Sequence, residues 1–319
     1  MKTSLICTVL NEEKTIGNLL DSILGQTRKP DEIVIVDGGS VDGTINVLRK
    51  YAKKLPIRIV SAYGANIAQG RNIAIKHAKN PVIVSTDGGT THDKDWFKNI
   101  VKNIEKGYDI SSGMFYPLPK TKFEELVGRL FYPNMDKVPD DWPPSSRSAA
   151  FTKKIWEKSG GYPEELYTAE DSIFNYRLRS VGAKYLAARD AKSHWRPRPN
   201  FNKFFKQYFT YAKGNGEALL AVNHYPECRM LYLFWGLAAA VIVSYLYYPS
   251  LLWVPIVFIP LVSLLKSFAL FKDLIRTTSG AGLLIAAFVA NVLGSHYGLF
   301  LKALGRVKVK KVRYIRTVK

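Results

Sequence analysis

The segments SLICTVL (residues 4–10) and EIVIVD (residues 32–37) flank NEEKTIGNLLDSILGQ (residues 11–26), and this stretch decides the fold class. The flanking runs are short and apolar, which predicts buried strands, while the segment between them has helical spacing. The alternation continues along the chain, with strands predicted at 57–62 and 81–87 and helices at 43–54 and 68–79. Strands that alternate with helices predict an α/β fold with a mostly parallel open sheet.

Polar and acidic residues follow several of the predicted strands. Asn11 and Glu12 come after the first strand, Asp37 ends the second and Asp87 ends the fourth. Ligands of open α/β sheets bind beyond the carboxyl ends of the strands, so these residues indicate a site for a nucleotide and a metal. The sequence contains neither GxGxxG after the first strand nor GxxxxGK[ST], which excludes a dinucleotide site and a P-loop.

The chain has 319 residues and a formal net charge of +20. At about 100–200 residues per domain, this length allows one large domain or two smaller parts. The two cysteines, Cys7 and Cys228, are too few for a disulfide framework or a cysteine-rich zinc site, and Cys7 is expected in the core. A net charge of +20 could attract nucleic acid or anionic lipid headgroups. Because the chain also contains long apolar stretches, described next, lipid headgroups are the favoured partner.

Residues 231–265 contain no charged side chain. As one helix this run would be about 52 Å long, which exceeds the roughly 30 Å of bilayer hydrocarbon. The run must therefore break, and Tyr248-Pro249-Ser250 is the predicted place. The expected structure is a transmembrane helical hairpin of residues 231–248 and 251–271.

The sequence leaves open the position of a third apolar stretch, residues 280–301, which crosses the membrane, re-enters it or lies in the interface. The tail of residues 305–319 carries seven basic residues and no acidic one, so the positive-inside rule places it in the cytoplasm. The N-terminal segment is too interrupted for a signal peptide, which keeps the first domain in the cytoplasm as well. Both ends on one side require an even number of crossings of the cell membrane.

Residues 199–230 contain aromatic residues at three- and four-residue steps, with lysines between them. This pattern predicts amphipathic helices at the membrane interface, and a core helix of the soluble domain is the alternative. The expected order is therefore a soluble domain at 1–198, interface helices at 199–230, membrane-embedded helices at 231–304 and a basic tail at 305–319.

Four stretches carry a resemblance to a known family: TVLNEEKTIGNLLDSILGQTRKPDEIVIVDGGSVDGT, GRNIAIKHAKNPVIVSTDGGT, RSAAFTKKIWEKSGGYPEE and AEDSIFNYRLRSVG. In this order, over about residues 3–216, they resemble the family 2 glycosyltransferases. The resemblance implies a GT-A (Rossmann-like) fold and inverting transfer of a sugar from a UDP- or GDP-sugar. The apolar hairpin is similar to the membrane anchors of members that glycosylate lipid carriers or extrude polysaccharides.

The resemblance also implies roles for single residues on the donor side. Asp37 would accept hydrogen bonds from the nucleotide base, Asn11 and Glu12 would line the same pocket, and Arg71 would face the diphosphate. The alternative for Asp37 is a role in the turn DGGSVDGT, which is the role expected of Asp42.

Asp87-Gly88-Gly89 stands where the family has an Asp-x-Asp metal motif, but the second carboxylate is missing. Mg²⁺ and Mn²⁺ prefer carboxylate oxygens, so Asp87 is the expected ligand of either ion, completed by phosphate, water or a distant side chain. His194 is a candidate for that side chain, with an exposed structural histidine as the alternative, and His92 and Asp93 lie just downstream of Asp87.

Glu170 and Asp171 begin a predicted helix, where acidic residues also stabilise the helix dipole. In the family this pair supplies the base that takes the proton from the acceptor hydroxyl, and Asp171 is the expected base. The resemblance places Arg147, Gln207 and Tyr211 on the acceptor side.

The expected function is inverting glycosyl transfer to a membrane-associated acceptor, a polyprenyl phosphate or a lipid-linked glycan, at the cytoplasmic face. One alternative is a membrane-tethered transferase that acts on a non-lipid glycan or a protein. The other is a non-catalytic nucleotide-binding scaffold. Thr210-Tyr211 replaces the Arg-Trp pair of the processive members, which argues against a processive synthase.

Overall fold

The computed structural model describes residues 1–219, 229–308 and 314–318 and divides into two compact units. The first unit holds residues 1–118, 133–196 and the C-terminal strand. The second unit holds residues 119–132 and 197–308. The predicted boundary near residue 198 thus lies close to that of the structure, except that residues 119–132 join the helical unit. Cys228 and part of the predicted 199–230 and 305–319 segments lie outside the described residues.

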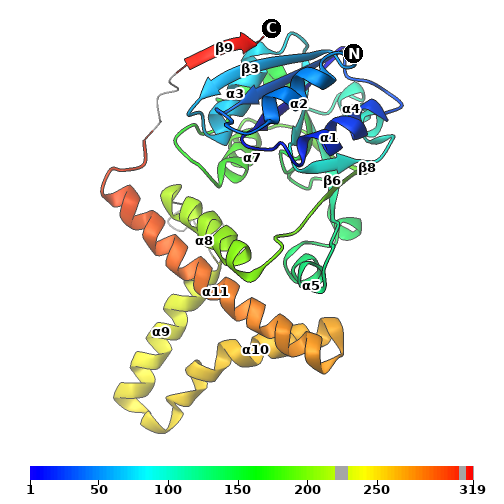
Figure 1. Ribbon diagram of the computed structural model, residues 1–319. Coiled ribbons are helices and arrows are strands. Elements are labelled where there is room, and N and C mark those ends of the chain that lie inside the picture. The colour runs from blue at the N-terminus through cyan, green and yellow to red at the C-terminus, as the bar shows by residue number, and fades with distance from the viewer. Residues whose placement is uncertain (220–228, 309–313, 319) are drawn as a thin grey trace. The chain divides into compact units, whose positions relative to one another are not determined.

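A single sheet forms the centre of the first unit (Figure 1). Its strands are β1 (Thr3–Val9), β2 (Glu32–Asp37), β3 (Ile57–Tyr63), β4 (Val82–Asp87), β5 (Thr90–His92), β6 (Ile110–Pro117), β7 (Ser148–Thr152), β8 (Tyr185–Trp195) and β9 (Tyr314–Val318). They lie in the order β5-β8-β6-β7-β4-β1-β2-β3-β9. The four strands predicted from the sequence are parallel neighbours, because helical crossovers join them.

The remaining strands make the sheet mixed, where a mostly parallel sheet was predicted. β7 runs antiparallel to both β4 and β6, and β5 and β9 are antiparallel edge strands. The sequence predicted residues 305–319 only as a basic tail, with no strand, yet residues 314–318 pair with β3.

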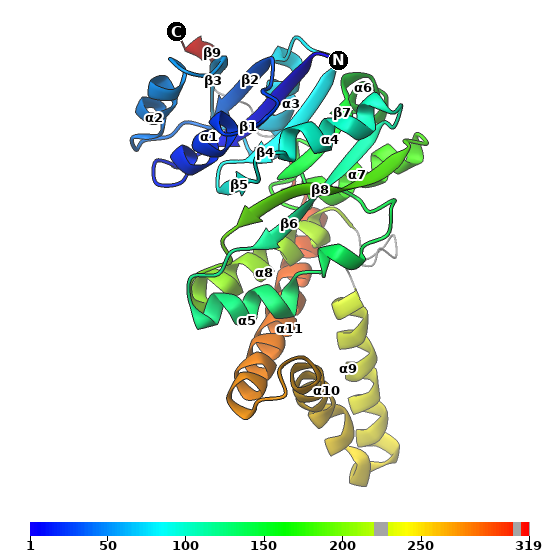
Figure 2. The same ribbon diagram turned by 90° about the vertical axis from the view of Figure 1, so that its right-hand side faces the viewer.

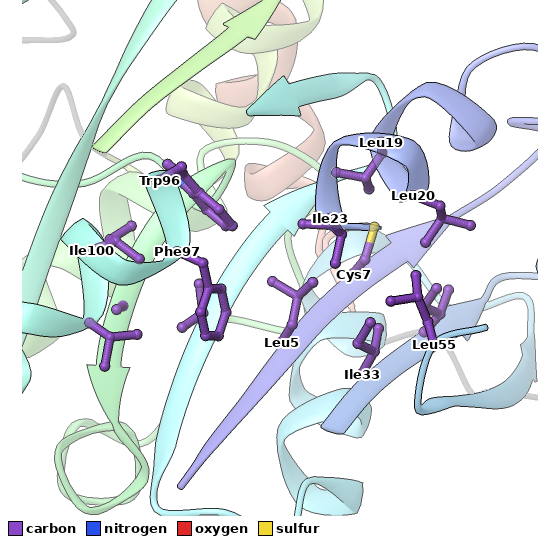
Figure 3. Packing of buried hydrophobic residues seen from close by; sticks show 14 of the residues in the cluster. Leu5, Cys7, Leu19, Leu20, Ile23, Ile33, Leu55, Trp96, Phe97 and Ile100 are labelled. Carbon is purple, nitrogen blue, oxygen red and sulfur yellow. The ribbon is translucent and has the colours of Figure 1, made fainter. Parts of the chain in front are cut away.

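Helices cover both faces of the sheet (Figure 2). One face packs against α1 (Ile16–Leu24), α2 (Thr44–Tyr51) and α4 (Trp96–Glu105), and the other against α3 (Ile67–His77), α6 (Lys153–Ser159) and α7 (Glu170–Ser180). Figure 3 shows Cys7 inside the first cluster, beside Leu19 and Ile23, which confirms it as a core residue. Because helices cover both faces of the sheet, a ligand site is expected at the ends of the strands.

The second unit consists of helices: α5 (Lys122–Phe131), α8 (Phe201–Glu217), α9 (Arg229–Tyr247), α10 (Trp253–Phe271) and α11 (Leu274–Ala303). A short 3₁₀ turn, Pro249–Leu251, separates α9 from α10 at the predicted break, and α10 continues through Pro260. The third apolar segment begins earlier than predicted, at Leu274. By length and composition, Pro249–Phe271 and Leu274–Ala303 are long and apolar enough to cross a membrane, while Leu231–Tyr247 is shorter.

The aromatic side chains of α8 are divided between protein and solvent. Phe204 and Tyr208 pack against α5 in a cluster that also contains side chains of α11, and Phe204 is fully buried. Phe201 and Tyr211 are exposed. The placement of this segment at a membrane interface therefore stays a prediction, since much of its aromatic face already contacts helices of its own unit.

Candidate active site

The register of the parallel strands brings two of the predicted acidic residues to one edge of the sheet. Val9 pairs with Asp37, and Thr8 pairs with Asp87 on its other side. Asp37 and Asp87 thus flank the carboxyl end of β1 on neighbouring strands, as the sequence predicted. The candidate site lies at this edge of the sheet.

The turn after β2 is fixed by Asp37 and Asn11. Asp37 is buried and accepts the backbone N–H groups of Gly39 at 3.2 Å and Ser40 at 3.1 Å. Asn11 has a left-handed backbone with φ of 57°, and its Oδ1 accepts the N–H of Val41 at 2.9 Å. Both side chains therefore shape this loop, so the turn role is observed for Asp37 and its contact with a base remains a prediction.

Glu12 and Asp42 also take local partners. Glu12 accepts the hydroxyl of Thr15, and its side chain lies against Gly88, where an added Cβ would come within 3.3 Å of Glu12 Cγ. Asp42 accepts the N–H groups of Thr44 at 3.0 Å and of Glu13, which confirms its expected turn role.

The guanidinium of Arg71 contacts the carboxylates of Asp87, Glu170 and Asp171, and these four residues are called the Arg71 cluster below. Its Nη2 donates to Asp87 Oδ1 at 2.9 Å, while Nη1 donates to Glu170 Oε1 at 2.8 Å and Asp171 Oδ1 at 2.9 Å. The Arg71 side chain is only 3% exposed. Although burial alone would lower its pKa, attraction by the three carboxylates raises the Arg71 pKa well above its ordinary value. The predicted contact of Arg71 with a diphosphate stays a prediction, and the observed partners of its guanidinium are the three carboxylates.

The electrostatics of the cluster act on Glu170 most strongly. Burial disfavours its charged form and the neighbouring Asp171 repels it, so the Glu170 pKa rises to about 7 despite the opposing effect of Arg71. The residue before it, Ala169, has φ of 66°, a left-handed conformation that costs energy in a non-glycine residue. This strained residue begins α7 and directs both carboxylates toward Arg71.

Asp171 is more open than Glu170, with 29% of its side chain exposed against 11%. Ser146 donates two hydrogen bonds to Asp171: its backbone N–H donates to Oδ2 at 3.1 Å, and its hydroxyl donates to Oδ1. Because that hydroxyl proton is committed to Asp171, the Tyr162 O–H donates to Ser146 Oγ, at 2.7 Å. Burial raises the pKa of Tyr162, which keeps this donor protonated.

Asn72, the neighbour of Arg71, fixes the loop that carries Tyr162. Its Nδ2 donates to the Tyr162 carbonyl and to Glu164 Oε1, both at 2.9 Å. Its Oδ1 accepts the Tyr162 N–H at 3.0 Å and the Trp156 indole N–H at 3.2 Å. The sequence reasoning missed Asn72, Tyr162 and Ser146, although the stretches GRN, GGYPEE and RSAAF contain or adjoin them.

Arg147 follows Ser146 and lies between two aromatic rings. Its guanidinium carbon is 5.1 Å from the centre of Phe115 and 4.8 Å from that of Trp195, and Nε donates to Ser145 Oγ at 3.1 Å. Among the described residues, no side chain or carbonyl accepts from its two terminal nitrogens. This fixed arginine directly follows Ser146, which contacts Asp171, and its place on the acceptor side stays a prediction.

The histidines near Asp87 have other partners. His92 is buried, stacks on Trp96 at 3.6 Å and contacts Thr86 and Ser193; burial lowers its pKa to about 3. His194 lies within β8 and contacts Asp93 Oδ1 at 2.9 Å. No hydrogen bond or ion pair joins His194 to Asp87 in the described parts of the chain, so its metal role stays a prediction.

Asp87 remains the predicted metal contact. Its Oδ1 faces Arg71, whereas its Oδ2 receives no hydrogen bond from the described residues. In the same parts of the chain, no group of three or more His, Cys, Asp or Glu side chains is placed to hold an ion. The residues present fit Mg²⁺ or Mn²⁺ only if the donor diphosphate and water supply most of the ligands.

Gln207 and Tyr211, predicted for the acceptor side, lie on α8 in the second unit. Gln207 Nε2 donates to the Tyr211 hydroxyl at 2.7 Å, and Gln207 Oε1 is buried with no partner among the described residues. Their relation to the Arg71 cluster stays a prediction.

Comparison with known protein families matches residues 4–154 to glycosyl transferase family 2. The match contains β1–β4, Arg71, Asp87 and Ser146 and ends before Glu170 and Asp171.

Characterised relatives are similar over more of the chain. The succinoglycan biosynthesis protein ExoA of Rhizobium meliloti is 23% identical over 71% of this chain and 73% of its own length. Glycosyltransferase AglE of Haloferax volcanii is 26% identical over 66% of this chain and 72% of its own length. The poly(ribitol-phosphate) β-N-acetylglucosaminyltransferase TarS of Staphylococcus aureus is 25% identical over 56% of this chain, which spans only 32% of TarS.

Solved structures of similar fold cover nearly the whole chain. The mannosyltransferase PcManGT of Pyrobaculum calidifontis, in complex with GDP-Man and Mn²⁺, has a TM-score of 0.61 at 22% identity and covers 91% of this chain and 87% of its own. Residues 1–349 of S. aureus TarS with UDP-GlcNAc have a TM-score of 0.54 at 18% identity, covering 96% and 92%. At these identities the likenesses establish the fold, and they agree with the predicted GT-A architecture.

Proposed function

We propose that the chain, whose residues 4–154 match glycosyl transferase family 2, transfers a sugar, with inversion, from a nucleotide-sugar donor to a membrane-associated acceptor. The acceptor is a polyprenyl phosphate or a lipid-linked glycan, and the reaction takes place at the cytoplasmic face of the cell membrane. The donor is a UDP- or GDP-sugar; PcManGT and TarS were solved with GDP-Man and UDP-GlcNAc.

The proposal rests mainly on the two ion pairs that Arg71 forms with Asp87 and Asp171. One terminal nitrogen holds Asp87 and the other holds Asp171, which keeps the two carboxylates within about 8 Å of each other across the fixed guanidinium fork. In the proposed reaction this spacing suits a donor-side group at Asp87 and a base at Asp171, on either side of the anomeric carbon. A scaffold that only binds nucleotide has no need for the second carboxylate.

In the proposed reaction with a lipid-linked glycan, Asp171 takes the proton of the acceptor hydroxyl as its oxygen attacks the anomeric carbon. A polyprenyl phosphate attacks through an oxygen that is already largely ionised and needs no base. The new C–O bond forms while the bond from that carbon to the diphosphate oxygen breaks, and the nucleoside diphosphate leaves with the electron pair. Ser146 and Arg71 hold Asp171 in place and exclude rotation of its carboxylate. A divalent cation at Asp87, when bound, supplies charge for the leaving diphosphate.

The membrane part of the proposal rests on exposed apolar surface in the second unit. In the candidate span Pro249–Phe271, only 12% of the most apolar window is buried. Large side chains are exposed all along α9 and α10, among them Trp235, Ile242, Trp253, Ile256 and Phe268. Soluble proteins rarely expose contiguous apolar patches of this kind, whereas lipid covers them in an integral protein.

Arg147 favours an acceptor with a negative group. A guanidinium held between two rings, with its terminal nitrogens unpaired among the described residues, presents a rigid pair of donors to a phosphate. This supports a polyprenyl phosphate or a diphosphate-linked glycan over a neutral glycan or a protein.

The test is transfer by the purified full chain in lipid nanodiscs, with Mn²⁺ and a panel of UDP- and GDP-sugars. We expect one donor to raise the melting temperature and to be consumed when the lipid acceptor is present. Binding without hydrolysis or transfer, for every donor and acceptor class, would support the non-catalytic scaffold. Transfer to a soluble glycan or a protein but not to a lipid acceptor would support a tethered transferase.

A further inference from the structure

Helix α11 has two sides of different character. Val289, Leu293, Tyr297, Phe300 and Leu304 follow one another at steps of four, four, three and four residues, and each is 41–57% exposed. At 3.6 residues per turn these positions form one continuous apolar stripe, called the outer stripe of α11 below. Small buried residues occupy much of the remaining circumference, among them Ala287, Gly294, Ser295 and Gly298.

The buried side of α11 lies directly on α8, as Figures 1 and 2 both show. A Cβ added at Gly298 would lie 2.0 Å from the Lys213 carbonyl oxygen, and one at Gly294 would lie 2.3 Å from that of Phe209. The backbones therefore touch with no room for a methyl group. α8 in turn exposes Asn202, Lys203 and Lys206, a polar surface that favours water.

The hairpin of α9 and α10 contacts α11 at two separate places. Phe234 and Trp235, near the start of α9, have ring centres 5.5 and 5.4 Å from that of His296. Ser267, near the end of α10, lies where a Cβ of Gly280 would be. Positions 280 and 296 are about 24 Å apart along a helix, so α11 joins the two open ends of the hairpin.

The sheet of the first unit restricts the topology. β9 follows α11 in sequence and pairs with β3 over Tyr314–Val318, while β3 precedes every apolar helix. Both strands of this pair must lie on one side of the membrane. The helices between them can cross only an even number of times, and α9, α10 and α11 cannot all cross.

We infer that α11 is not a span but lies in the plane of the membrane face next to the catalytic unit, with its outer stripe in the boundary between headgroups and acyl chains of an anionic bilayer. α9 and α10 are then the two crossings among the described helices. This rests on the membrane part of the proposed function. It assigns an in-plane position to a segment whose length and hydropathy alone fit a span.

Charge supports an anionic lipid surface over a second copy of the chain. Exposed Lys272 and Arg276 lie at the start of α11, and exposed Lys302 and Arg306 lie at its end. Basic residues at both ends match one layer of anionic headgroups when the helix lies flat, because each is attracted to the negative surface of such a bilayer. An in-plane helix with an apolar stripe and basic flanks is the usual form of an interfacial anchor.

Single-cysteine variants in vesicles of phosphatidylcholine and phosphatidylglycerol test the inference, in a chain carrying Cys7→Ala and Cys228→Ser. Arg276→Cys and Lys302→Cys at the two ends of α11, and Ser250→Cys at the turn of the hairpin, receive a membrane-impermeant maleimide from one side at a time. We expect residues 276 and 302 to react from the same side and residue 250 from the other. Reaction of 276 and 302 from opposite sides would overturn the inference.

Depth measurements on the outer stripe provide the second readout. A spin label at Leu293→Cys, Tyr297→Cys and Phe300→Cys should report one shallow depth, about 5–10 Å below the headgroups. A depth that changes steadily from 293 to 300 would show a crossing, and rapid disulfide formation between two copies at residue 297 would show a dimer contact instead. Extraction of the whole chain by alkaline carbonate would contradict the membrane anchor itself, while glycosyl transfer, measured separately, tests the catalytic proposal.

Discussion

Ser146 contacts both carboxylate oxygens of Asp171, with its N–H 3.1 Å from Oδ2 and its hydroxyl donating to Oδ1. The hydroxyl is oriented by Tyr162, which is buried and donates to Ser146 Oγ. Tyr162 in turn belongs to a loop that Asn72 fixes through four hydrogen bonds. The direction of the candidate base is therefore set by α3 and the Tyr162 loop rather than by α7 alone.

Ser146→Ala should lower kcat about ten-fold, since it removes one of two hydrogen bonds to a charged group and leaves the N–H in place. Each 1.4 kcal/mol corresponds to a factor of ten, and a bond to a charged group contributes roughly that much or more. KM for the donor should change little. Steady-state kinetics in nanodiscs measure both constants.

Ser145→Ala is the control for the Asp171 contact, because its hydroxyl is 3.5 Å from Asp171 Oδ2, at the limit of a hydrogen bond. The same hydroxyl accepts from Arg147 Nε, so the two variants are compared at saturating acceptor. We expect near-normal kcat for this variant. An equal loss in both variants would mean that the loop as a whole, and not the Ser146 contact, supports turnover.

Arg71→Met should destabilise the catalytic unit strongly. It leaves the buried Glu170 and the partly buried Asp87 and Asp171 without their common cation, and breaking a buried ion pair costs about 3–5 kcal/mol. Arg71→Lys should recover only part of the loss, because one ammonium cannot contact carboxylates on both sides of the guanidinium fork. Thermal unfolding measures the change, and Arg179→Met, which breaks an exposed pair with Asp141, serves as control. A loss no larger for Arg71→Met than for this control would contradict the role of Arg71.

Asp87→Asn should abolish the part of nucleotide-sugar affinity that depends on Mg²⁺ or Mn²⁺. An amide retains the shape but removes the carboxylate charge that hard cations prefer. Titration calorimetry with and without Mn²⁺ measures the difference directly, independently of turnover. Asp93→Asn, which frees His194 from its partner, is the control. Metal dependence that survives Asp87→Asn but not Asp93→Asn would move the site toward His194.

The strand ends and the break between the two apolar helices could be predicted from the sequence because they depend on local patterns. Alternation of apolar strands and helices placed Asp37 and Asp87, and the proline after Tyr248 placed the break between α9 and α10. The inward turn of Arg71 could not be predicted, since it depends on residues about 100 positions away. Ser146, Tyr162 and Asn72 were missed for the same reason, as hydroxyl and amide side chains acquire a role only through tertiary contacts. The pairing of β9 with β3 likewise joins the two ends of the sequence.

Gly298→Ala should destabilise the α8–α11 contact of the second unit. The new methyl group would meet the Lys213 carbonyl oxygen, a backbone atom that cannot move aside without separating the helices. Overpacking of this kind costs about 1–3 kcal/mol. Gly282→Ala on the same helix is the control, because no atom lies within 4 Å of the added Cβ and alanine favours helix. Thermal unfolding in one detergent compares the two; equal melting temperatures would mean that the helices do not pack this closely.

The raised pKa of Glu170 gives the Arg71 cluster a pH dependence. Because the folded-state pKa is raised to about 7, mainly by burial, the stabilisation of the protonated form is complete below the unfolded-state pKa and is lost as pH rises through 7. Glu170→Gln removes this titration. The stability of the wild type relative to Glu170→Gln should therefore fall between pH 5 and pH 8, which urea unfolding at each pH measures. A constant difference would show that Glu170 is ionised throughout.

Asp171→Asn tests the base itself, and the outcome depends on the acceptor. For a hydroxyl acceptor, kcat should fall by about 10²–10⁴ while donor affinity changes little, because the amide cannot take the proton. A phosphate acceptor is largely ionised at neutral pH, with a second pKa of about 6, so its oxygen attacks without help and the loss should be much smaller. Glu170→Gln should do less than Asp171→Asn with a hydroxyl acceptor, since Glu170 is the more buried of the two. Single-turnover rates at saturating donor, with a lipid phosphate and with a lipid-linked glycan, separate these cases. A large loss confined to Glu170→Gln would move the base by one residue, and normal turnover of both variants on the glycan would exclude either carboxylate as the base.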